Sequence, residues 1–116
     1  MFPSHDQRGY FMVIYVNIDE TICDTPKDRD YSKSTPIFEN IEKINKLFEN
    51  GNIIVYWTAR GTKTGIDWRS TTEKQFEKWG VKYHELKFGK PSYDLFIDDK
   101  NIFSETFFKS IGSLIC

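Results

Sequence analysis

The sequence predicts an α/β fold, specifically a Rossmann-like three-layer α/β/α sandwich with a mostly parallel sheet. Two observations lead to this prediction. Short apolar, β-branched runs, which are typical of strands buried on both faces, alternate with segments whose apolar residues recur at helical spacing. Where strands and helices alternate in this order, parallel strands joined by right-handed crossover helices are the expected arrangement.

Four segments are predicted to be strands. Phe11–Val16 and Ile53–Trp57 are near-continuous apolar runs of the length that strands have. Residues 81–88 are expected to contain a short third strand, which the turn-forming Gly89-Lys90-Pro91 ends. A fourth strand is expected at Tyr93–Ile97, directly before an acidic pair.

Three segments are predicted to be helices. The first begins at Thr35-Pro36, which is typical of an N-cap followed by proline at the first helical position, and it stops at Asn50-Gly51. The second is capped by Asp67 or Ser70 and ends near residue 79, before a glycine. The last is capped by Ser104. The polar stretch between the first strand and the first helix is expected to be a surface flap.

The chain length and the start of the ordered pattern predict one domain. The 116 residues suffice for a single compact unit. The periodic pattern begins only near Tyr10, so residues 1–11 are predicted to be a flexible extension and residues 12–116 the domain.

Composition and charge exclude several classes of partner. The formal net charge of −1, with basic and acidic residues nearly equal in number, provides no electrostatic footprint for nucleic acid or an anionic membrane. No apolar run is long enough to span a membrane and no secretory leader is visible, so a cytoplasmic protein is expected. Cys23 and Cys116 have no metal-type spacing and are expected to be reduced thiols, although a disulfide between them stays open.

Polar residues gather where the predicted strands end. In a parallel sheet the ligand lies beyond the carboxyl ends of the strands, so these side chains should converge. Clustered carboxylates need a cation among them, and Mg²⁺ suits a site that keeps water and takes a phosphate oxygen. A lysine and a threonine would bind the phosphate. The residues are Asn17, Asp19 and Thr21 after the first strand, Thr58 and Arg60 after the second, Lys90 before the fourth, and Asp98 and Asp99 after it.

Four of these segments together resemble the motifs of the haloacid-dehalogenase (HAD) superfamily of phosphatases. Asn17-Ile18-Asp19-Glu20-Thr21 corresponds to D-x-D-x-T, the first motif of that family. Thr58 corresponds to the second motif, Lys90 to the third and Asp98-Asp99 to the fourth. All four occur in the family's order and span residues 12–99, which is far more specific than any one of them.

The resemblance implies a Mg²⁺-dependent phosphomonoester hydrolase. By analogy, position 17 is the nucleophile, and Asp19 is the general acid and base and binds Mg²⁺ through its backbone carbonyl. Thr58 and Lys90 would bind and neutralise the phosphoryl group. Asp98 and Asp99 would complete the set of metal ligands, which includes positions 17 and 19. The substrate-binding set would be Thr21, Thr58, Ala59, Arg60 and Lys90.

The resemblance is narrower for one branch of the family. Trp57-Thr58-Ala59-Arg60-Gly61 and residues 79–84 are similar to small members without a cap domain, which are associated with the biosynthesis of capsules and surface polysaccharides. The gaps after Thr21 and Thr58 are too short for a cap. The expected substrate is therefore a sugar phosphate or a similar small metabolite at an open site, and a homo-oligomer stays open as a partner.

Asn17 departs from the family pattern, because a neutral carboxamide is a poor nucleophile. Three explanations stay open. The asparagine can mark an engineered inactive variant, a natural pseudoenzyme that binds a phosphorylated ligand, or an enzyme in which Asp19 activates water directly. The predicted alternative function is therefore a binding protein without turnover.

Several residues also have plain structural interpretations. Lys87 competes with Lys90, and Arg60 could be a surface arginine. The tryptophans and His84 are expected to pack rather than bind sugar, and Cys23 lacks a partner base. A response-regulator receiver uses a similar set of residues, but its acidic pair follows the first strand, so the order of motifs rejects it.

Overall fold

The computed structural model describes residues 11–110. The predicted extension, apart from Phe11, and Cys116 lie outside the described residues. The elements in chain order are β1 (Val13–Val16), β2 (Cys23–Asp24), the 3-10 turn η1 (Tyr31–Lys33), β3 (Thr35–Pro36), α1 (Phe38–Glu49), β4 (Ile53–Trp57), α2 (Arg69–Trp79), β5 (Glu85–Lys87) and α3 (Ser104–Ser110).

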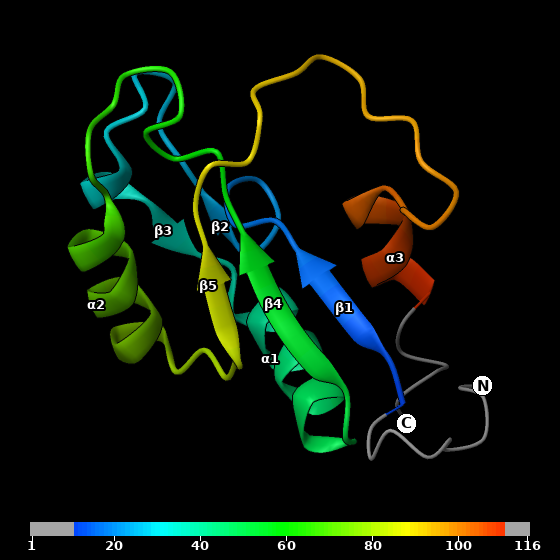
Figure 1. Cartoon of the computed structure of the whole chain (residues 1–116). Helices are drawn as coiled ribbons and strands as arrows, with labels where there is room; N and C mark the ends of the chain where they lie inside the picture. The colour runs from blue at the N-terminus through cyan, green and yellow to red at the C-terminus, as the bar shows by residue number, and fades with distance from the viewer. Residues whose placement is uncertain (1–10, 111–116) are drawn as a thin grey trace.

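A three-stranded sheet in the order β1-β4-β5 forms the centre of the fold (Figure 1). Both strand pairs are parallel: Val16 lies beside Tyr56, and Tyr56 lies beside Leu86. Helix α1 connects the first pair and α2 connects the second, as the alternating pattern predicts. The parallel direction places the ends of all three strands at one edge of the sheet, where the predicted site residues follow them.

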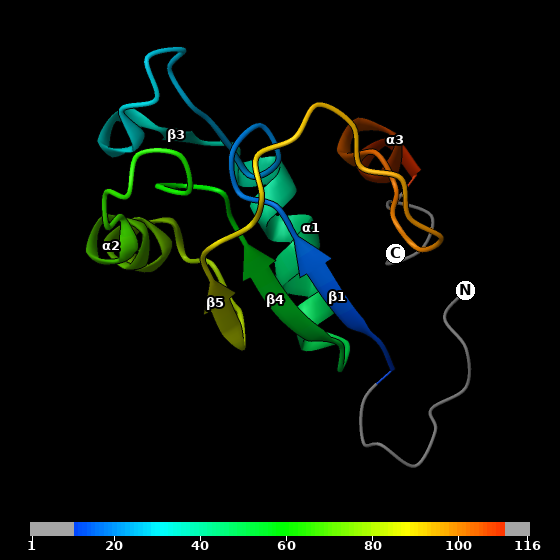
Figure 2. The ribbon, with the colours of Figure 1, turned by 45° about the horizontal axis from the view of Figure 1, so that its top comes forward.

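The hydrophobic core lies between one face of the sheet and the helices. Every second residue of β1 and β4 points to that face, where Tyr56 meets Phe76 of α2 with ring centroids 4.9 Å apart. Figure 2 shows α1 behind this face of the sheet. The core residues are Val16, Ile18, Ile22, Cys23, Ile41, Ile44, Leu47, Ile54, Tyr56, Phe76, Trp79, Val81, Leu86 and Phe108.

Among the described residues, helices cover one face of the sheet only, so the third layer of the predicted sandwich stays a prediction. On the opposite face Val55 of β4, beside Tyr15, is buried at 3% exposure. Val13 and Tyr15 of β1 are 46% and 50% exposed. The Tyr15 ring lies 5.9 Å from the ring centre of Trp57 and 5.5 Å from the Lys87 ammonium group, and no helix among residues 11–110 covers this face (Figure 1). The residues that follow β5 form no second set of crossovers, so the described part of the chain has two layers.

The flap is a small antiparallel hairpin in which β2 pairs with β3. Thr35 and Pro36, predicted as the start of the first helix, belong to β3 instead. The amide of Ile37 donates to the carbonyl of Ile22 at 2.8 Å, which ties the hairpin to the turn after β1 and delays the helix until Phe38. The pairing of β3 with β2 has therefore overridden the local sequence pattern that predicted a helix start at Thr35-Pro36.

The other helix predictions are confirmed within one or two residues. Helix α2 ends at Trp79, and the φ of 71° at the following Gly80 is the left-handed conformation typical of a helix stop. Asp67 accepts a hydrogen bond from the amide of Arg69 at the start of α2. Helix α3 begins at Ser104, as predicted.

The predicted fourth strand does not form. Residues 91–103 contain no helix or strand, and every one of them is exposed. In Figure 1 this segment runs from the end of β5 over the top of β1 to α3. We call residues 91–103 the arm. Within residues 11–110, no helix is long and apolar enough to cross a membrane.

Replacement of Tyr56 by phenylalanine tests the packing of the core. The Tyr56 hydroxyl is buried without a hydrogen-bond partner among the described residues, and burial raises the pKa of the phenol. Because an unpaired buried hydroxyl is destabilising, Tyr56→Phe should keep the free energy of unfolding or raise it by about 1–2 kcal/mol in chemical denaturation.

Thr72→Val is the matched control for this prediction. Thr72 is equally buried, but its hydroxyl accepts a hydrogen bond from Arg60 at 3.0 Å. The loss of this hydrogen bond in Thr72→Val should lower the free energy of unfolding by about 1–3 kcal/mol. Equal losses in both variants would contradict the assignment of an unpaired hydroxyl to Tyr56.

Candidate active site

The turn after β1 presents the first group of site residues. The carbonyl of Ile18 accepts from the amides of Thr21 and Ile22 at 3.2 and 2.9 Å, and Glu20 has a φ of 58°. This tight turn holds the segment that follows β1 at the carboxyl edge of the sheet. The predicted acidic motif is therefore built on a fixed backbone rather than on a loose loop.

Asn17 is the centre of a hydrogen-bond group in this turn. Its Nδ2 donates to the carbonyl of Asp19 at 2.7 Å and to the hydroxyl of Thr21 at 3.4 Å. Its Oδ1 accepts from the Nζ of Lys90 at 3.3 Å. The first and third predicted motifs are therefore in direct contact, and Thr21 belongs to the same group.

The backbone fixes Lys90 at this site. The Lys90 amide donates to the carbonyl of Thr58 at 3.1 Å, and its carbonyl accepts from the hydroxyl of Thr62 at 2.8 Å. The ammonium group lies 5.9 Å from the ring centre of Trp57 and 5.4 Å from that of Tyr93. Lys87, the competing lysine, instead donates to the hydroxyl of Tyr15 on the face of the sheet opposite the helices.

Thr58 follows β4 and lies inside the site. It is 1% exposed, and its Oγ1 accepts from the amide of Arg60 at 3.1 Å. Because the Thr58 oxygen accepts this bond, its hydroxyl proton is still available to be donated to a ligand oxygen. Ala59 forms the turn between them, since its carbonyl accepts from the amide of Thr62 at 3.0 Å.

Arg60 is buried and its guanidinium group binds Asp19. The side chain of Arg60 is 0% exposed and that of Asp19 is 14% exposed. Nη2 lies 2.9 Å from Oδ1 of Asp19, and Nε lies 3.1 Å from Oδ2. This two-point pairing fixes the plane of the carboxylate as well as its position.

The remaining Arg60 donors point to α2 and the flap. Nη1 donates to Thr72 at 3.0 Å and to Gln75 at 2.6 Å, and the group lies 4.9 Å from the ring centre of Tyr31. Arg60 is therefore not a surface arginine, since its guanidinium group is buried and each of its nitrogens donates to a group of the protein. The sequence contained one signal for this role: Thr72 is a polar residue on the apolar face of a predicted helix.

Two flap hydroxyls complete the surroundings of Asp19. The hydroxyl of Thr25 donates a hydrogen bond to Oδ1 of Asp19. The Oγ1 of Thr25 and the Oγ of Ser34 are 2.7 Å apart. The sequence analysis did not identify either residue. Only the β2–β3 pairing brings them to the site, and no spacing in the sequence indicates that pairing.

Cys23 is a free, buried thiol beside the same carboxylate. Its Sγ lies 3.5 Å from Oδ1 of Asp19. Burial, reinforced by the negative charge of Asp19, raises the pKa of the thiol from 9.0 to about 12. The thiol therefore stays protonated at neutral pH, which agrees with the prediction that Cys23 is not a nucleophile.

The acidic pair does not join the site in this structure, so the residues present do not fit a Mg²⁺ ion. Asp98 and Asp99 are exposed on the arm, and among residues 11–110 no three Asp, Glu, His or Cys side chains are close enough to hold a metal. The backbone carbonyl of Asp19, expected to be a metal ligand, already accepts a hydrogen bond from the side-chain Nδ2 of Asn17.

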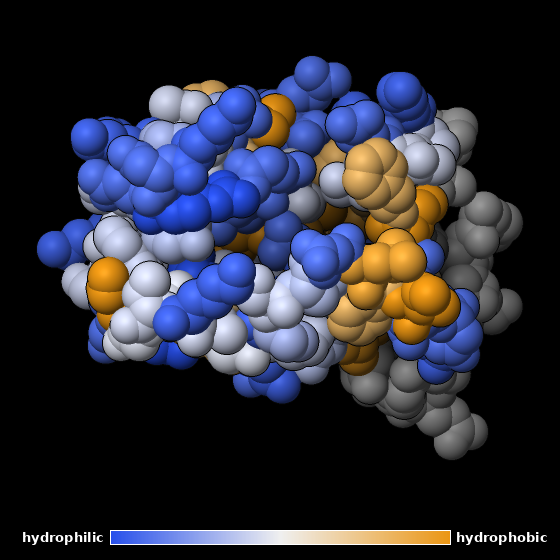
Figure 3. Space-filling model, turned by 90° about the horizontal axis from the view of Figure 1, so that it is seen from above, coloured by the Kyte–Doolittle hydropathy of each residue, from blue (hydrophilic) through white to orange (hydrophobic). Residues whose placement is uncertain are grey.

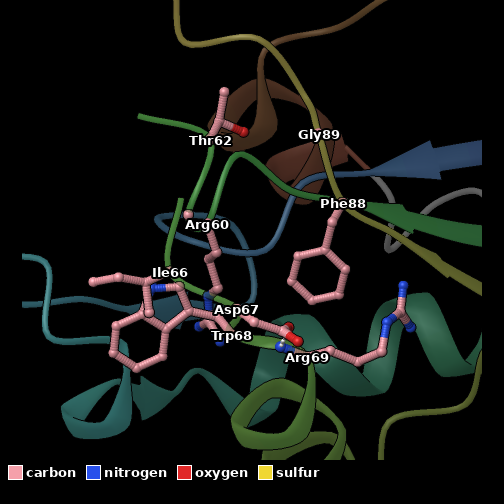
Figure 4. A pocket seen from close by; sticks show the side chains of 9 residues that line it. Arg60, Thr62, Ile66, Asp67, Trp68, Arg69, Phe88 and Gly89 are labelled. Carbon is pink, nitrogen blue, oxygen red and sulfur yellow. Dashed lines mark hydrogen bonds between the residues drawn. The ribbon is translucent and has the colours of Figure 1, made fainter. Parts of the chain in front are cut away.

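A hollow of about 320 Å³ adjoins the site. It lies between the 60–69 loop and the end of β5, with Phe88 pointing into it opposite Trp68 (Figure 4). The loop bends closely here: a Cβ on Gly61 would lie 2.1 Å from the carbonyl oxygen of Ile66. Arg69 packs over the ring of Phe88 at 4.7 Å and closes one side.

The fold is similar to that of a solved structure. It is the crystal structure of a structural-genomics target from Vibrio cholerae, with a TM-score of 0.75 over 90% of this chain and 97% of that chain. The two sequences are 24% identical, so the likeness shows the fold alone. No model of a known protein family matches the chain, and no curated protein does. The chain is therefore a small α/β protein with a parallel sheet.

Removal of the Arg60 charge should destabilise the fold strongly. Arg60→Met keeps much of the volume but leaves the Asp19 carboxylate buried without its partner, which should lower the free energy of unfolding by about 3–5 kcal/mol. Arg29→Met is the matched control, because Arg29 forms a half-exposed pair with Glu20 at 2.9 Å and its loss should cost less than about 1 kcal/mol. Similar losses in urea titrations would contradict the structural role of Arg60.

Cys23 should be unreactive in the folded chain. In a Cys116→Ser background, a thiol reagent at neutral pH should label Cys23 only after denaturant unfolds the protein. The sign of the pH effect follows from the raised pKa: the stabilisation by the neutral thiol is complete below pH 9.0 and is lost as the pH rises toward about 12. Rapid labelling of the native chain would show that the turn after β1 opens readily.

Proposed function

We propose that this chain has the scaffold of a HAD-like phosphomonoester hydrolase and binds a small phosphorylated metabolite, such as a sugar phosphate, at the ends of β1 and β4. The observation that carries the proposal is the contact of Lys90 with Asn17 at 3.3 Å. It joins a cation from the loop after β5 to the position where the resemblance expects the nucleophile.

The geometry supports a phosphoryl site between these residues. Lys90 supplies positive charge, and the Thr58 hydroxyl can donate to a phosphoryl oxygen, because its own oxygen accepts from the Arg60 amide. Phosphoryl transfer depends chiefly on positioning and charge neutralisation, which such a rigid pair provides. The neighbouring hollow lined by Trp68 and Phe88 is the place for the part of the substrate that leaves.

In the catalytic form of this scaffold, a carboxylate at position 17 would attack phosphorus. The bond between phosphorus and the leaving oxygen would break, and by the resemblance the proton for that oxygen would come from Asp19. This role requires the Asp19 carboxylate to leave its pair with Arg60 and take up a proton beforehand. Water would then attack the acyl phosphate and transfer a proton back to Asp19, which releases phosphate. Mg²⁺ dependence belongs to this proposal on the resemblance, and no step is derived through the ion because the described residues do not gather its ligands.

One observation favours the alternative, a ligand-binding protein without turnover. The Nδ2 of Asn17 donates to the Asp19 carbonyl at 2.7 Å. An aspartate here would place two oxygens against each other and would need a cation between them. With asparagine at position 17, the turn therefore needs no cation to hold it together. This suits a site that binds a phosphorylated ligand through Lys90 and Thr58 but does not react with it.

Asn17→Asp separates the two proposals. It supplies the missing carboxylate, and with Mg²⁺ and a panel of sugar phosphates it should release phosphate faster than Asn17→Ala by a factor on the order of 10³ or more. Colorimetric phosphate release is the measurement, and Asn17→Asp/Lys90→Met is the control that should lose the gain. If Asn17→Asp is no faster than Asn17→Ala on any substrate, the enzyme proposal is wrong.

A further inference from the structure

The hollow beside the candidate site shares a wall with the loop that positions Lys90. Gly89 lines the hollow and directly precedes Lys90, and the hydroxyl of Thr62, which also lines it, donates to the Lys90 carbonyl at 2.8 Å. Consecutive Cα atoms are only about 3.8 Å apart. A phosphate held by Lys90 and Thr58 is therefore close enough for the group that it esterifies to enter the hollow.

Two aromatic side chains face each other across this hollow. They are Trp68 and Phe88 (Figure 4). The guanidinium group of Arg69 covers one face of the Phe88 ring at 4.7 Å. The flap holds Trp68 in place, because the rings of Tyr31 and Trp68 meet edge to face with their centres 5.1 Å apart. Such a fixed aromatic wall suits a ligand with a flat apolar face.

Asp67 supplies the polar group of the hollow. In the view of Figure 4 its carboxylate lies between the Trp68 and Phe88 rings. Its Oδ1 accepts from the amide of Arg69 at 3.0 Å, and no group among residues 11–110 donates to its Oδ2. An ionised carboxylate only accepts hydrogen bonds. A ligand in the hollow therefore has to bring a donor of its own.

The charges at the walls and the size of the hollow narrow the ligand further. An anionic group would meet the Asp67 carboxylate, and a cationic group would meet the Arg69 guanidinium, so a neutral ligand avoids both. The volume of about 320 Å³ is near the lower end of the range for ligand pockets, about 300–1,000 Å³. It suits one small ring rather than a chain of them.

We propose that the hollow binds a single neutral ring with several hydroxyl groups, such as a pyranose, and that Asp67 and Trp68 select it. One face of the ring lies on Trp68, and a hydroxyl donates to Oδ2 of Asp67. An open polyol lacks the flat face, and an aryl group lacks the donors. The inference rests on the proposed function, because the phosphate of the same ligand lies at Lys90 and Thr58.

Calorimetry with the native chain is the first test. The probes are glucose phosphorylated at C1 or C6, glycerol phosphate, phenyl phosphate and inorganic phosphate, and a glucose phosphate should bind most tightly. Asp67→Asn keeps an oxygen for the Arg69 amide but puts an amide NH₂ in place of the free oxygen. It should weaken the binding of the glucose phosphate by about tenfold and leave that of inorganic phosphate unchanged.

Asp28→Asn is the matched control. Asp28 is also an exposed carboxylate whose Oδ1 accepts from the amide two residues further on, that of Asp30 at 3.0 Å, but it does not line the hollow. This variant should bind every probe as the native chain does. Equal affinity of Asp67→Asn and the native chain for the glucose phosphates would overturn the inference, as would tighter binding of phenyl or glycerol phosphate.

A sugar without phosphate provides the second test. In NMR spectra of the isotope-labelled native chain, methyl glucoside at millimolar concentration should shift the indole N–H resonance of Trp68, which is assigned by its loss in Trp68→Phe. The indole resonances of Trp57, which contacts Tyr15, and of the buried Trp79 should stay in place. A Trp68 resonance that does not move would overturn the inference.

Lys90→Met separates this inference from the proposed function. If this variant loses inorganic phosphate while neither Asp67→Asn nor the glucoside has an effect, the phosphoryl site stands and the assignment of the hollow is wrong. If Lys90→Met binds all phosphates as the native chain does, the proposed function fails instead. The response of Trp68 to the glucoside then still decides whether the hollow takes a sugar ring.

Discussion

The buried guanidinium group of Arg60 is the interaction on which the rest of the structure depends. It joins the turn after β1 through Asp19, helix α2 through Thr72 and Gln75, and the flap through Ser34. A charge without solvent exposure is tolerated only when its donors are bound, and here the hydrogen bonds supply that compensation. Through Arg60, the loop that follows β4 therefore connects the turn after β1, helix α2 and the flap, which the sheet alone does not join.

This arrangement has a consequence for the chemistry at Asp19. Arg60 and Thr25 hold its carboxylate from two sides, so its position does not depend on a bound metal or substrate. Asn17 likewise holds the backbone of Asp19 in place, because its side-chain Nδ2 donates a hydrogen bond to the Asp19 carbonyl. The turn is thus held by groups of the chain itself, and under the proposed function Lys90 and Thr58 are left to contact a ligand.

The sequence predicted the elements whose signals are local. The apolar runs located β1 and β4, helical spacing located α1 and α2, and the contact of Lys90 with position 17 followed from motif order. The predictions failed where a distant contact decides. Thr35-Pro36 became a strand because β2 lies beside it. The partners of Arg60 on α2, Thr72 and Gln75, were not predicted, because only the fold brings them to its guanidinium group.

The arm, whose apolar side chains lie on the side of α3 in Figure 3, shows the same distinction at the level of the whole chain. Its residues have the composition of a strand, yet residues 91–103 are all exposed and pair with no strand among the described residues. A strand needs a neighbouring edge as well as the right composition, so the local sequence alone could not decide the structure of this segment.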